Sequence, residues 1–235
     1  MPNTPLRAVA TRLLKRRYPG KPIPDFDLTA ASVPRYLVAR GRATRARKRA
    51  TEPQPWITQD AIDALATLLD PAGDGLEFGS GGSTIWLARH SGSVRSVEAF
   101  DPWFEPLQQR LKDAGVTNST VELVSAPQLG YRSDAHRTAY VNVFPDIAPE
   151  SLSFVFVDGE YRDEAALRGI TLLKPGGLLV LDNANTYLPS ATRVPWKVRE
   201  PITDAWKEFV ERTADWPQTW TSNGVWDTVI WVKPT

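Results

Sequence analysis

The residues best suited to chemistry lie in a glycine-rich segment, residues 75–84, which reads Gly-Leu-Glu-Phe-Gly-Ser-Gly-Gly-Ser-Thr. A short apolar stretch ends there in an acidic residue, Glu77, and the glycine turn leads into an amphipathic run that opens with Ser83-Thr84. Glycines let a backbone approach a ligand closely, and a helix N-terminus offers free N–H groups. Glu98 ends the next apolar run, about where nucleotide-binding folds place a carboxylate for ribose hydroxyls. The pattern therefore predicts a nucleotide-type binding element.

The residues of this glycine-rich segment argue against a dinucleotide as the bound ligand. The third glycine of a dinucleotide fingerprint, which lets a helix pack closely beneath a pyrophosphate, is replaced here by Thr84. The carboxylate of Glu77, two residues before the first glycine of the turn, also suits an ammonium group better than a pyrophosphate. An NAD-dependent oxidoreductase is therefore disfavoured, and a glycine-rich turn without a ligand is the plainer alternative.

Two later strand ends carry oxygen ligands. The apolar run 154–157 is followed by Asp158, and the run 178–181 is followed by Asp182-Asn183. Both strand ends are expected on the carboxyl edge of a parallel sheet, where open α/β folds bind ligands. Two carboxylates and an amide oxygen suit Mg²⁺. The alternative is that Asp158 caps the following helix and Asp182 only positions a loop.

The pattern E-x-G-x-G-x-S-T resembles motif I of the class I S-adenosylmethionine-dependent methyltransferases. Lys174-Pro175-Gly176-Gly177 is predicted to form a turn before the strand 178–181, and this turn resembles another common feature of that family. Asp158 with Asp182-Asn183 resembles the metal site of the catechol O-methyltransferase-like branch. The resemblance covers the chain from Pro55 to its end. It implies that S-adenosylmethionine is bound by Glu77, Gly79, Ser80, Gly81, Ser83, Thr84, Glu98, Ser125, Ala126 and Asp158.

The resemblance further implies methyl transfer to an oxygen of a small-molecule acceptor, with Mg²⁺ held by Asp158, Asp182 and Asn183 favouring deprotonation of the acceptor hydroxyl. The lysine that the catechol enzymes carry three residues after the strand-four aspartate is Tyr161 here. The candidate bases are therefore Tyr161 and His136, which complete the catalytic set with Asp158. An exposed loop histidine is the plainer interpretation of His136.

Composition places further limits on function. The 235 residues include no cysteine, which excludes disulfides, thiolate zinc sites and cysteine catalysis and is compatible with a cytoplasmic location. We expect no membrane span and no secretory signal, because long apolar runs are absent and the N-terminus is charged. The net charge of +1 hides a strongly basic stretch, residues 1–52. That stretch is predicted to form helices at 6–14 and 30–40, followed by a linker at 41–55.

Strands and helices alternate from residue 56 onward. This alternation predicts an α/β fold with a doubly wound, Rossmann-like parallel sheet, and Asn223-Gly224 predicts a C-terminal antiparallel hairpin. The expected division is a basic helical extension, residues 1–52, and a methyltransferase domain, residues 53–235. Expected strands are 76–78, 94–97, 121–124, 154–157, 178–181, 219–222 and 227–232. Expected helices are one that is capped by Thr58 and ended by Pro71, and those at 83–90, 103–114, 163–173 and 203–211, with an irregular stretch at 126–150.

The sequence of the basic extension does not determine its binding partners. Two functional alternatives are an RNA methyltransferase guided by this arm and a non-catalytic nucleotide-binding domain. The helix at 6–14 has an apolar stripe and a cationic face, so it could pack on the domain, mediate homo-oligomers, or meet a membrane surface or nucleic acid. We favour packing, because most amphipathic helices in globular chains are packed.

Overall fold

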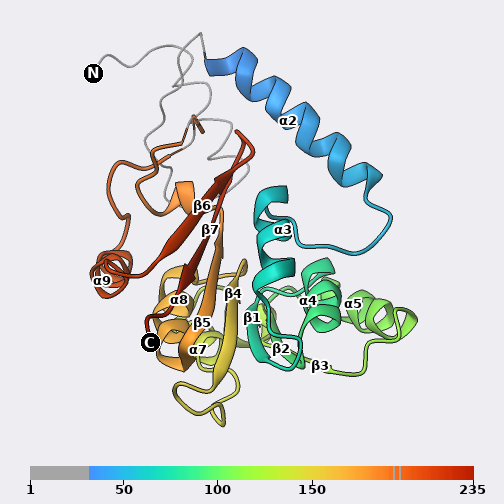
Figure 1. Cartoon of the computed structure of the whole chain (residues 1–235). Helices are drawn as coiled ribbons and strands as arrows, with labels where there is room; N and C mark the ends of the chain where they lie inside the picture. The colour runs from blue at the N-terminus through green and yellow to red at the C-terminus, as the bar shows by residue number, and fades with distance from the viewer. Residues whose placement is uncertain (1–31, 193, 196) are drawn as a thin grey trace.

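A seven-stranded sheet forms the centre of the computed structural model, which describes residues 32–192, 194–195 and 197–235. The strands lie in the order β3-β2-β1-β4-β5-β7-β6, and β7 runs antiparallel to both of its neighbours (Figure 1). The strands are β1 (Asp74–Phe78), β2 (Ser93–Glu98), β3 (Ser119–Leu123), β4 (Leu152–Val157), β5 (Leu173–Asp182), β6 (Gln218–Ser222) and β7 (Asp227–Val232). The prediction of a parallel sheet with a terminal antiparallel hairpin is confirmed.

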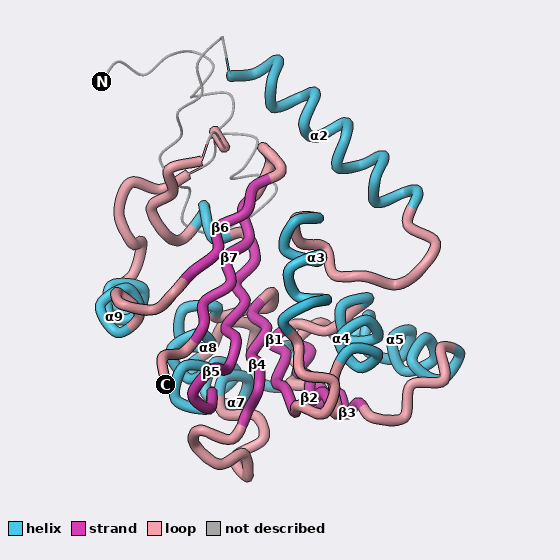
Figure 2. Tube along the Cα trace, in the orientation of Figure 1, coloured by secondary structure: helices cyan, strands magenta, loops and turns pink. Residues whose placement is uncertain are grey.

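Helices cover both faces of this sheet, and α2 lies apart from them (Figure 2). The core on one face is built with α3 and α4, next to α5, and the core on the other face with α7, α8 and α9. The helices are α2 (Ser32–Arg49), α3 (Gln59–Leu68), α4 (Gly82–His90), α5 (Asp101–Asp113), α6 (Ala126–Leu129), α7 (Asp134–Val141), α8 (Arg162–Leu172), the 3₁₀ turn η1 (Ala184–Thr186) and α9 (Asp204–Arg212).

Strand β4 shows why the sequence gives this layered arrangement. Phe154 and Phe156 pack into the core beneath α3 and α4, whereas Val155 and Val157 pack into the core beneath α8. All six of its residues are buried, as a central parallel strand with helices on both faces requires. Burial of each such side chain contributes about 2 kcal/mol to folding. The strand ends at Val157, so the next residue, Asp158, is fixed at the carboxyl edge.

Polar side chains begin two of the helices and form the hairpin turn. The Thr58 hydroxyl accepts a hydrogen bond from the Ala61 N–H and begins α3, and Thr203 begins α9 in the same way. In the hairpin turn, the Asn223 side-chain oxygen accepts from the backbone N–H groups of Val225 and Trp226.

Three local predictions are wrong, and one falls outside the described residues. Residues 41–49 are helical rather than a linker, because α2 continues to Arg49. The stretch 126–150 is not irregular, since Ser125 and Ser133 cap α6 and α7. The predicted turn 174–177 lies within β5, where the pairing with β4 shifts register. The helix predicted at 6–14 lies outside the described residues.

Within the described ranges we find no helix that combines the length and the hydropathy needed to cross a membrane.

Candidate active site

A large cavity, about 1750 Å³, opens at the carboxyl edge of β1, β2, β4 and β5. One side, called here the glycine-loop half, contains the turn 79–83, Glu98 and the residues that follow β2. The opposite side, called the carboxylate half, contains Asp158, Arg162 and Asp182-Asn183. Predicted site residues that line the cavity are Gly79, Ser80, Gly81, Ser83, Glu98, Ala126, Asp158, Asp182 and Asn183.

The glycine loop is held against the neighbouring strand end. Gly79 has a φ of +93°, and a Cβ atom there would lie 2.6 Å from the Gly159 Cα atom. By contrast, a Cβ atom on Gly81 would come no closer than 3.9 Å to any side chain. The backbone at Gly79 is therefore packed from behind, whereas the backbone at Gly81 faces open space in the cavity.

Glu98 is fixed by its own loop. One carboxylate oxygen accepts hydrogen bonds from the Ala99 and Phe100 N–H groups at 2.8 and 2.9 Å, and the other accepts from the Ser80 hydroxyl at 2.6 Å. The side chain is 8% exposed and lines the cavity. Because each carboxylate oxygen has two lone pairs, Oε2 keeps one acceptor site for a ligand hydroxyl.

Glu77 lies beneath the glycine loop rather than on the cavity wall. Its Oε2 atom accepts from the Thr84 and Ser96 hydroxyls, both at 2.6 Å, while its buried Oε1 atom has no partner among the described residues. The Thr84 hydroxyl in turn accepts from the Gly81 N–H. Burial away from water raises the pKa of Glu77 to about 7, against hydrogen bonds that lower it. Glu77 therefore supports the glycine loop and the start of α4 from beneath, through Thr84.

Ser125 also stands behind the wall. Its hydroxyl donates to Asp101 Oδ1 at 2.5 Å, and it caps α6, which brings Ala126 to the cavity. The second Asp101 oxygen is buried without a partner among the described residues, and Asp101 lines the cavity. This side chain is an additional ligand candidate in the glycine-loop half.

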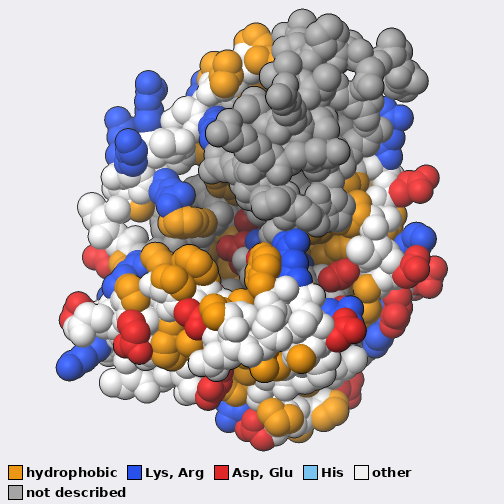
Figure 3. Space-filling model, turned by 180° about the vertical axis from the view of Figure 1, so that it is seen from behind, with side chains coloured by type: hydrophobic (Ala, Val, Ile, Leu, Met, Phe, Trp, Pro, Cys, Tyr) orange, Lys and Arg blue, Asp and Glu red, His pale blue; other side chains and the backbone are white. Residues whose placement is uncertain are grey.

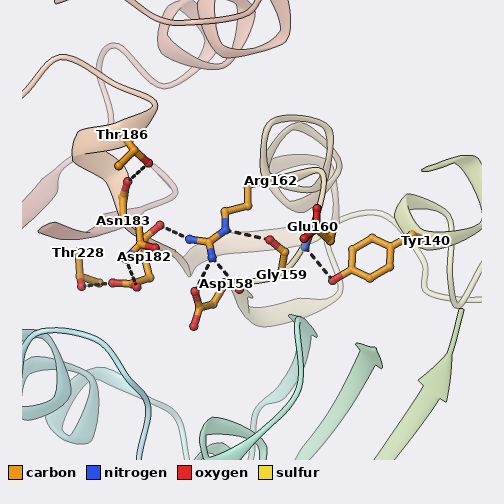
Figure 4. Close-up of polar contacts among 9 residues, drawn as sticks. All are labelled: Tyr140, Asp158, Gly159, Glu160, Arg162, Asp182, Asn183, Thr186 and Thr228. Atoms are coloured by element: carbon orange, nitrogen blue, oxygen red, sulfur yellow. Dashed lines mark hydrogen bonds and ion pairs between the residues drawn. The ribbon is translucent and has the colours of Figure 1, made fainter. Parts of the chain in front are cut away.

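The carboxylate half centres on Arg162, the first residue of α8 (Figure 4). Its guanidinium donates to the Asp158 carboxylate at 2.7 Å and to the Asp158 backbone oxygen at 2.8 Å. It also donates to the backbone oxygens of Gly159 and Asp182, at 2.9 and 2.6 Å. The Arg162 side chain is only 12% exposed. A permanent cation thus holds the two strand ends together.

The three predicted metal ligands do not fit an Mg²⁺ site in this arrangement. Asp158 is paired with Arg162, and the Asp182 carboxylate accepts from the Thr228 hydroxyl and the Asn183 side-chain amide. An amide that donates its N–H to a neighbouring carboxylate does not point its oxygen at a shared cation.

Electrostatics in this half favour the neutral carboxyl forms. Burial raises the pKa of Asp182 well above its ordinary value, and the charge of Asp158 adds to that effect. Burial also raises the pKa of Asp158, but the Arg162 guanidinium opposes the rise. Asp158 therefore keeps its charge more readily than Asp182.

The two candidate bases are brought together, although away from the cavity wall. His136 Nδ1 lies 2.6 Å from the Tyr161 hydroxyl, and His136 Nε2 lies 3.0 Å from the Val124 carbonyl. Because a carbonyl only accepts, Nε2 carries the proton, and a neutral ring therefore accepts at Nδ1 from Tyr161. Neither residue lines the cavity. His136 is fully buried, so its interpretation as an exposed loop histidine is wrong.

One face of α2 closes the cavity from the outside. Ala39, Arg42, Ala43, Ala46 and Arg47 recur at helical spacing along this lining face. None of the α2 residues is buried, and Arg47 stacks on the Trp56 ring. In the view of Figure 3, Lys and Arg side chains gather along α2 at the upper left, while acidic side chains spread over the lower half.

Two site residues were missed by sequence reasoning, Arg162 and Asp101. A basic residue in the first helical turn opposes the helix dipole, so Arg162 at the start of α8 was a detectable signal. Asp101 offered no such signal, because an acidic residue in the first turn of a helix is ordinary.

Comparison with known proteins was made by sequence and by structure. No family model matches the chain. A putative O-methyltransferase from Mycobacterium avium (strain 104) is 26% identical over 174 residues, covering 66% of this chain and 73% of that protein. An O-methyltransferase from Bacillus cereus, solved with SAH, gives a TM-score of 0.53 at 16% identity, covering 96% of this chain and 97% of that one.

A second solved structure is the O-methyltransferase TomG from Streptomyces achromogenes, which is involved in tomaymycin synthesis and was solved with SAM. It gives a TM-score of 0.51 at 21% identity, covering 85% of this chain and 90% of that one. At these identities the structures establish the fold alone, and the sequence relative agrees with the motifs. By fold, motif and sequence relative, the chain is similar to the class I S-adenosylmethionine-dependent methyltransferases, and in particular to O-methyltransferases.

Proposed function

We propose that this protein transfers a methyl group from S-adenosylmethionine to an oxygen of a small-molecule acceptor. The observation that carries the proposal is the continuity of the cavity. The glycine loop with Glu98 and the strand-end residue Asp158 line one space of about 1750 Å³, which has room for a nucleoside cofactor and a second molecule.

The glycine-loop half fits this cofactor. Glu98 offers a fixed carboxylate for ribose hydroxyls, and Gly81 leaves open space for close approach of the cofactor. Asp101 supplies one further unpaired acceptor on the same wall. When bound, S-adenosylmethionine supplies a sulfonium methyl that moves to the acceptor oxygen, the electron pair of the broken C–S bond staying on sulfur.

The carboxylate half then binds the acceptor. Asp158 lines the cavity with one carboxylate oxygen held by Arg162, and we assign it to accept the hydroxyl proton as the new O–C bond forms. Tyr161 and His136 shape this wall from behind, since their hydrogen bond ties α7 to the loop after β4. Most of the rate would come from holding oxygen and methyl in line at near-contact distance.

Three expectations from the sequence stay predictions. They are the division of the chain into residues 1–52 and 53–235, self-association through the basic extension, and a cytoplasmic location. Because α2 carries several arginines, RNA is also tested as a methyl acceptor, but the cavity favours a small molecule.

The test has two stages. Calorimetry of the full-length protein should show binding of S-adenosylmethionine or SAH, and tight binding of NAD with none of S-adenosylmethionine would reject the assignment. Transfer of a labelled methyl group should then be screened against hydroxylated small molecules and against RNA. Labelled RNA with no small-molecule product would favour the nucleic-acid alternative.

A further inference from the structure

The Arg162 guanidinium pairs with the carboxylate of Asp158, one of the three residues to which the family resemblance assigns a metal. In Figure 4 the guanidinium lies between the ends of β4 and β5, facing Asp158 on one side and the Asp182 backbone on the other. The same two strand ends carry the residues from which a magnesium site was predicted. A divalent cation bound to Asp158 would lie close to the Arg162 guanidinium, and like charges at short distance repel, so the arginine disfavours such a cation here.

We propose that the Arg162 guanidinium takes the place of the divalent cation, so that the acceptor site works without metal and Arg162 itself binds the acceptor oxygen. The inference rests on the proposed methyl transfer. It adds a catalytic residue and a metal-independent way of holding the acceptor.

The hydrogen-bond inventory of Arg162 supports this role. Among the described residues, bonds to Gly159, Asp158 and Asp182 account for four of its five N–H groups. The remaining N–H belongs to Nη1, and Arg162 lines the cavity. A guanidinium held by a fork of bonds presents this last donor in a fixed direction. An acceptor oxygen bound to this donor would share the guanidinium with the Asp158 carboxylate, which is held by Nη2.

The position of Arg162 in the chain supports the same conclusion. The first turn of a helix carries a partial positive charge, which disfavours a basic side chain. Arg162 nevertheless begins α8 and is largely buried. Burial of a charge is costly unless it is paired, and here Asp158 and three backbone oxygens provide the pairing. The strand-end carboxylate and the arginine therefore act as a unit.

The experiment measures Mn²⁺ binding to the full-length protein by electron paramagnetic resonance, with Mg²⁺ as competitor and without cofactor or acceptor. The wild-type protein should bind no Mn²⁺ at millimolar concentration. Arg162→Gln should gain one Mn²⁺ site that Mg²⁺ displaces, because its carboxylates lose their cation. Adding Asp158→Asn to that variant should remove the site again. Arg168→Gln is the matched control, because Arg168 lies on the same helix but donates only to backbone carbonyls.

Two results would overturn the proposal. The first is stoichiometric Mn²⁺ binding by the wild-type protein that Asp158→Asn abolishes. The second is a folded Arg162→Gln protein, checked by near-ultraviolet circular dichroism, that gains no Mn²⁺ site. If Arg162→Gln does not fold, Arg162→Lys replaces it, and Mn²⁺ binding by that variant would contradict a site already filled by a cation. None of these readouts requires methyl transfer, so failure here leaves the proposed function standing.

Discussion

The glycine-loop half and the carboxylate half of the cavity are built from contacts of different range. In the glycine-loop half, Ser80 bonds Glu98 and Ser96 bonds Glu77, pairs only 18 and 19 residues apart. In the carboxylate half, Asp182 depends on Thr228, 46 residues away. The α2 residues that line the cavity come from a segment that precedes every strand of the sheet. One half is therefore a local βαβ unit, and the other is assembled from distant segments.

This difference explains which part of the function can be read from the sequence. A ligand site within one βαβ unit has fixed spacing, so its motif identifies the cofactor class. A site assembled from distant segments has no fixed spacing, so acceptor identity leaves no motif. The following predictions test whether the two halves are separable in this way.

The largest effect on stability and cofactor binding is expected for a substitution at Gly79. Gly79→Ala places a Cβ atom against the backbone of Gly159 at a φ of +93°, so strain and overpacking together cost roughly 3–5 kcal/mol. The melting temperature should fall by roughly 10 °C, and SAH binding should be lost. Gly115→Ala is the control, because Gly115 has a φ of +65° with nothing within 4 Å. It should lower the melting temperature by only about 3 °C. Equal effects of the two substitutions would contradict the packing argument.

Glu98→Gln should have the next largest effect. The substitution removes the charge from a carboxylate that the loop has already fixed with three hydrogen bonds. Loss of a charge-assisted bond to a ribose hydroxyl costs about 1.5–3 kcal/mol, so calorimetry should show SAH binding weakened roughly 10- to 100-fold. Glu122→Gln on exposed β3 makes the same chemical change outside the cavity and should leave SAH affinity unchanged. Unchanged affinity in Glu98→Gln would remove this residue from the site.

Glu77 should make stability depend on pH. The folded protein holds its proton up to about pH 7, whereas the unfolded chain releases it near its ordinary pKa of 4.5. Stability should therefore fall as pH rises from 4.5 to about 7 and then level off, with a total loss of about 3 kcal/mol. Glu77→Gln should lack this part of the fall and should melt above the wild type at pH 8. Asp158 and Asp182 titrate in the same direction in both proteins, so the difference between the two curves isolates Glu77.

The sequence predicted the sheet, its terminal hairpin and most residues that line the glycine-loop half of the cavity, because these depend on short-range patterns. Thr58 as a helix cap and Asn223 as a turn residue act on their immediate neighbours. It did not predict that Arg162 would join two strand ends, because Arg162 reaches the second strand end through a backbone oxygen, which leaves no residue type to recognise in the sequence. It also missed α7, whose apolar face is short, and therefore missed the contact between His136 and Tyr161.

The smallest effect on cofactor binding is expected on α2. The double substitution Arg42→Glu and Arg47→Glu reverses two charges on the cavity-lining face, but no α2 residue is buried. Surface changes of this kind alter stability by about 0.5 kcal/mol, so SAH affinity should stay within about twofold of the wild type. If the acceptor is anionic, methyl transfer at low acceptor concentration should fall while the maximal rate changes less, since two cations that face the acceptor are lost. Arg45→Glu with Arg49→Glu makes the same charge change on residues that do not line the cavity and should leave transfer unchanged. If the Arg42 and Arg47 pair weakened SAH binding as much as Glu98→Gln does, α2 would belong to the cofactor site, and the division of the cavity into a local half and an assembled half would be wrong.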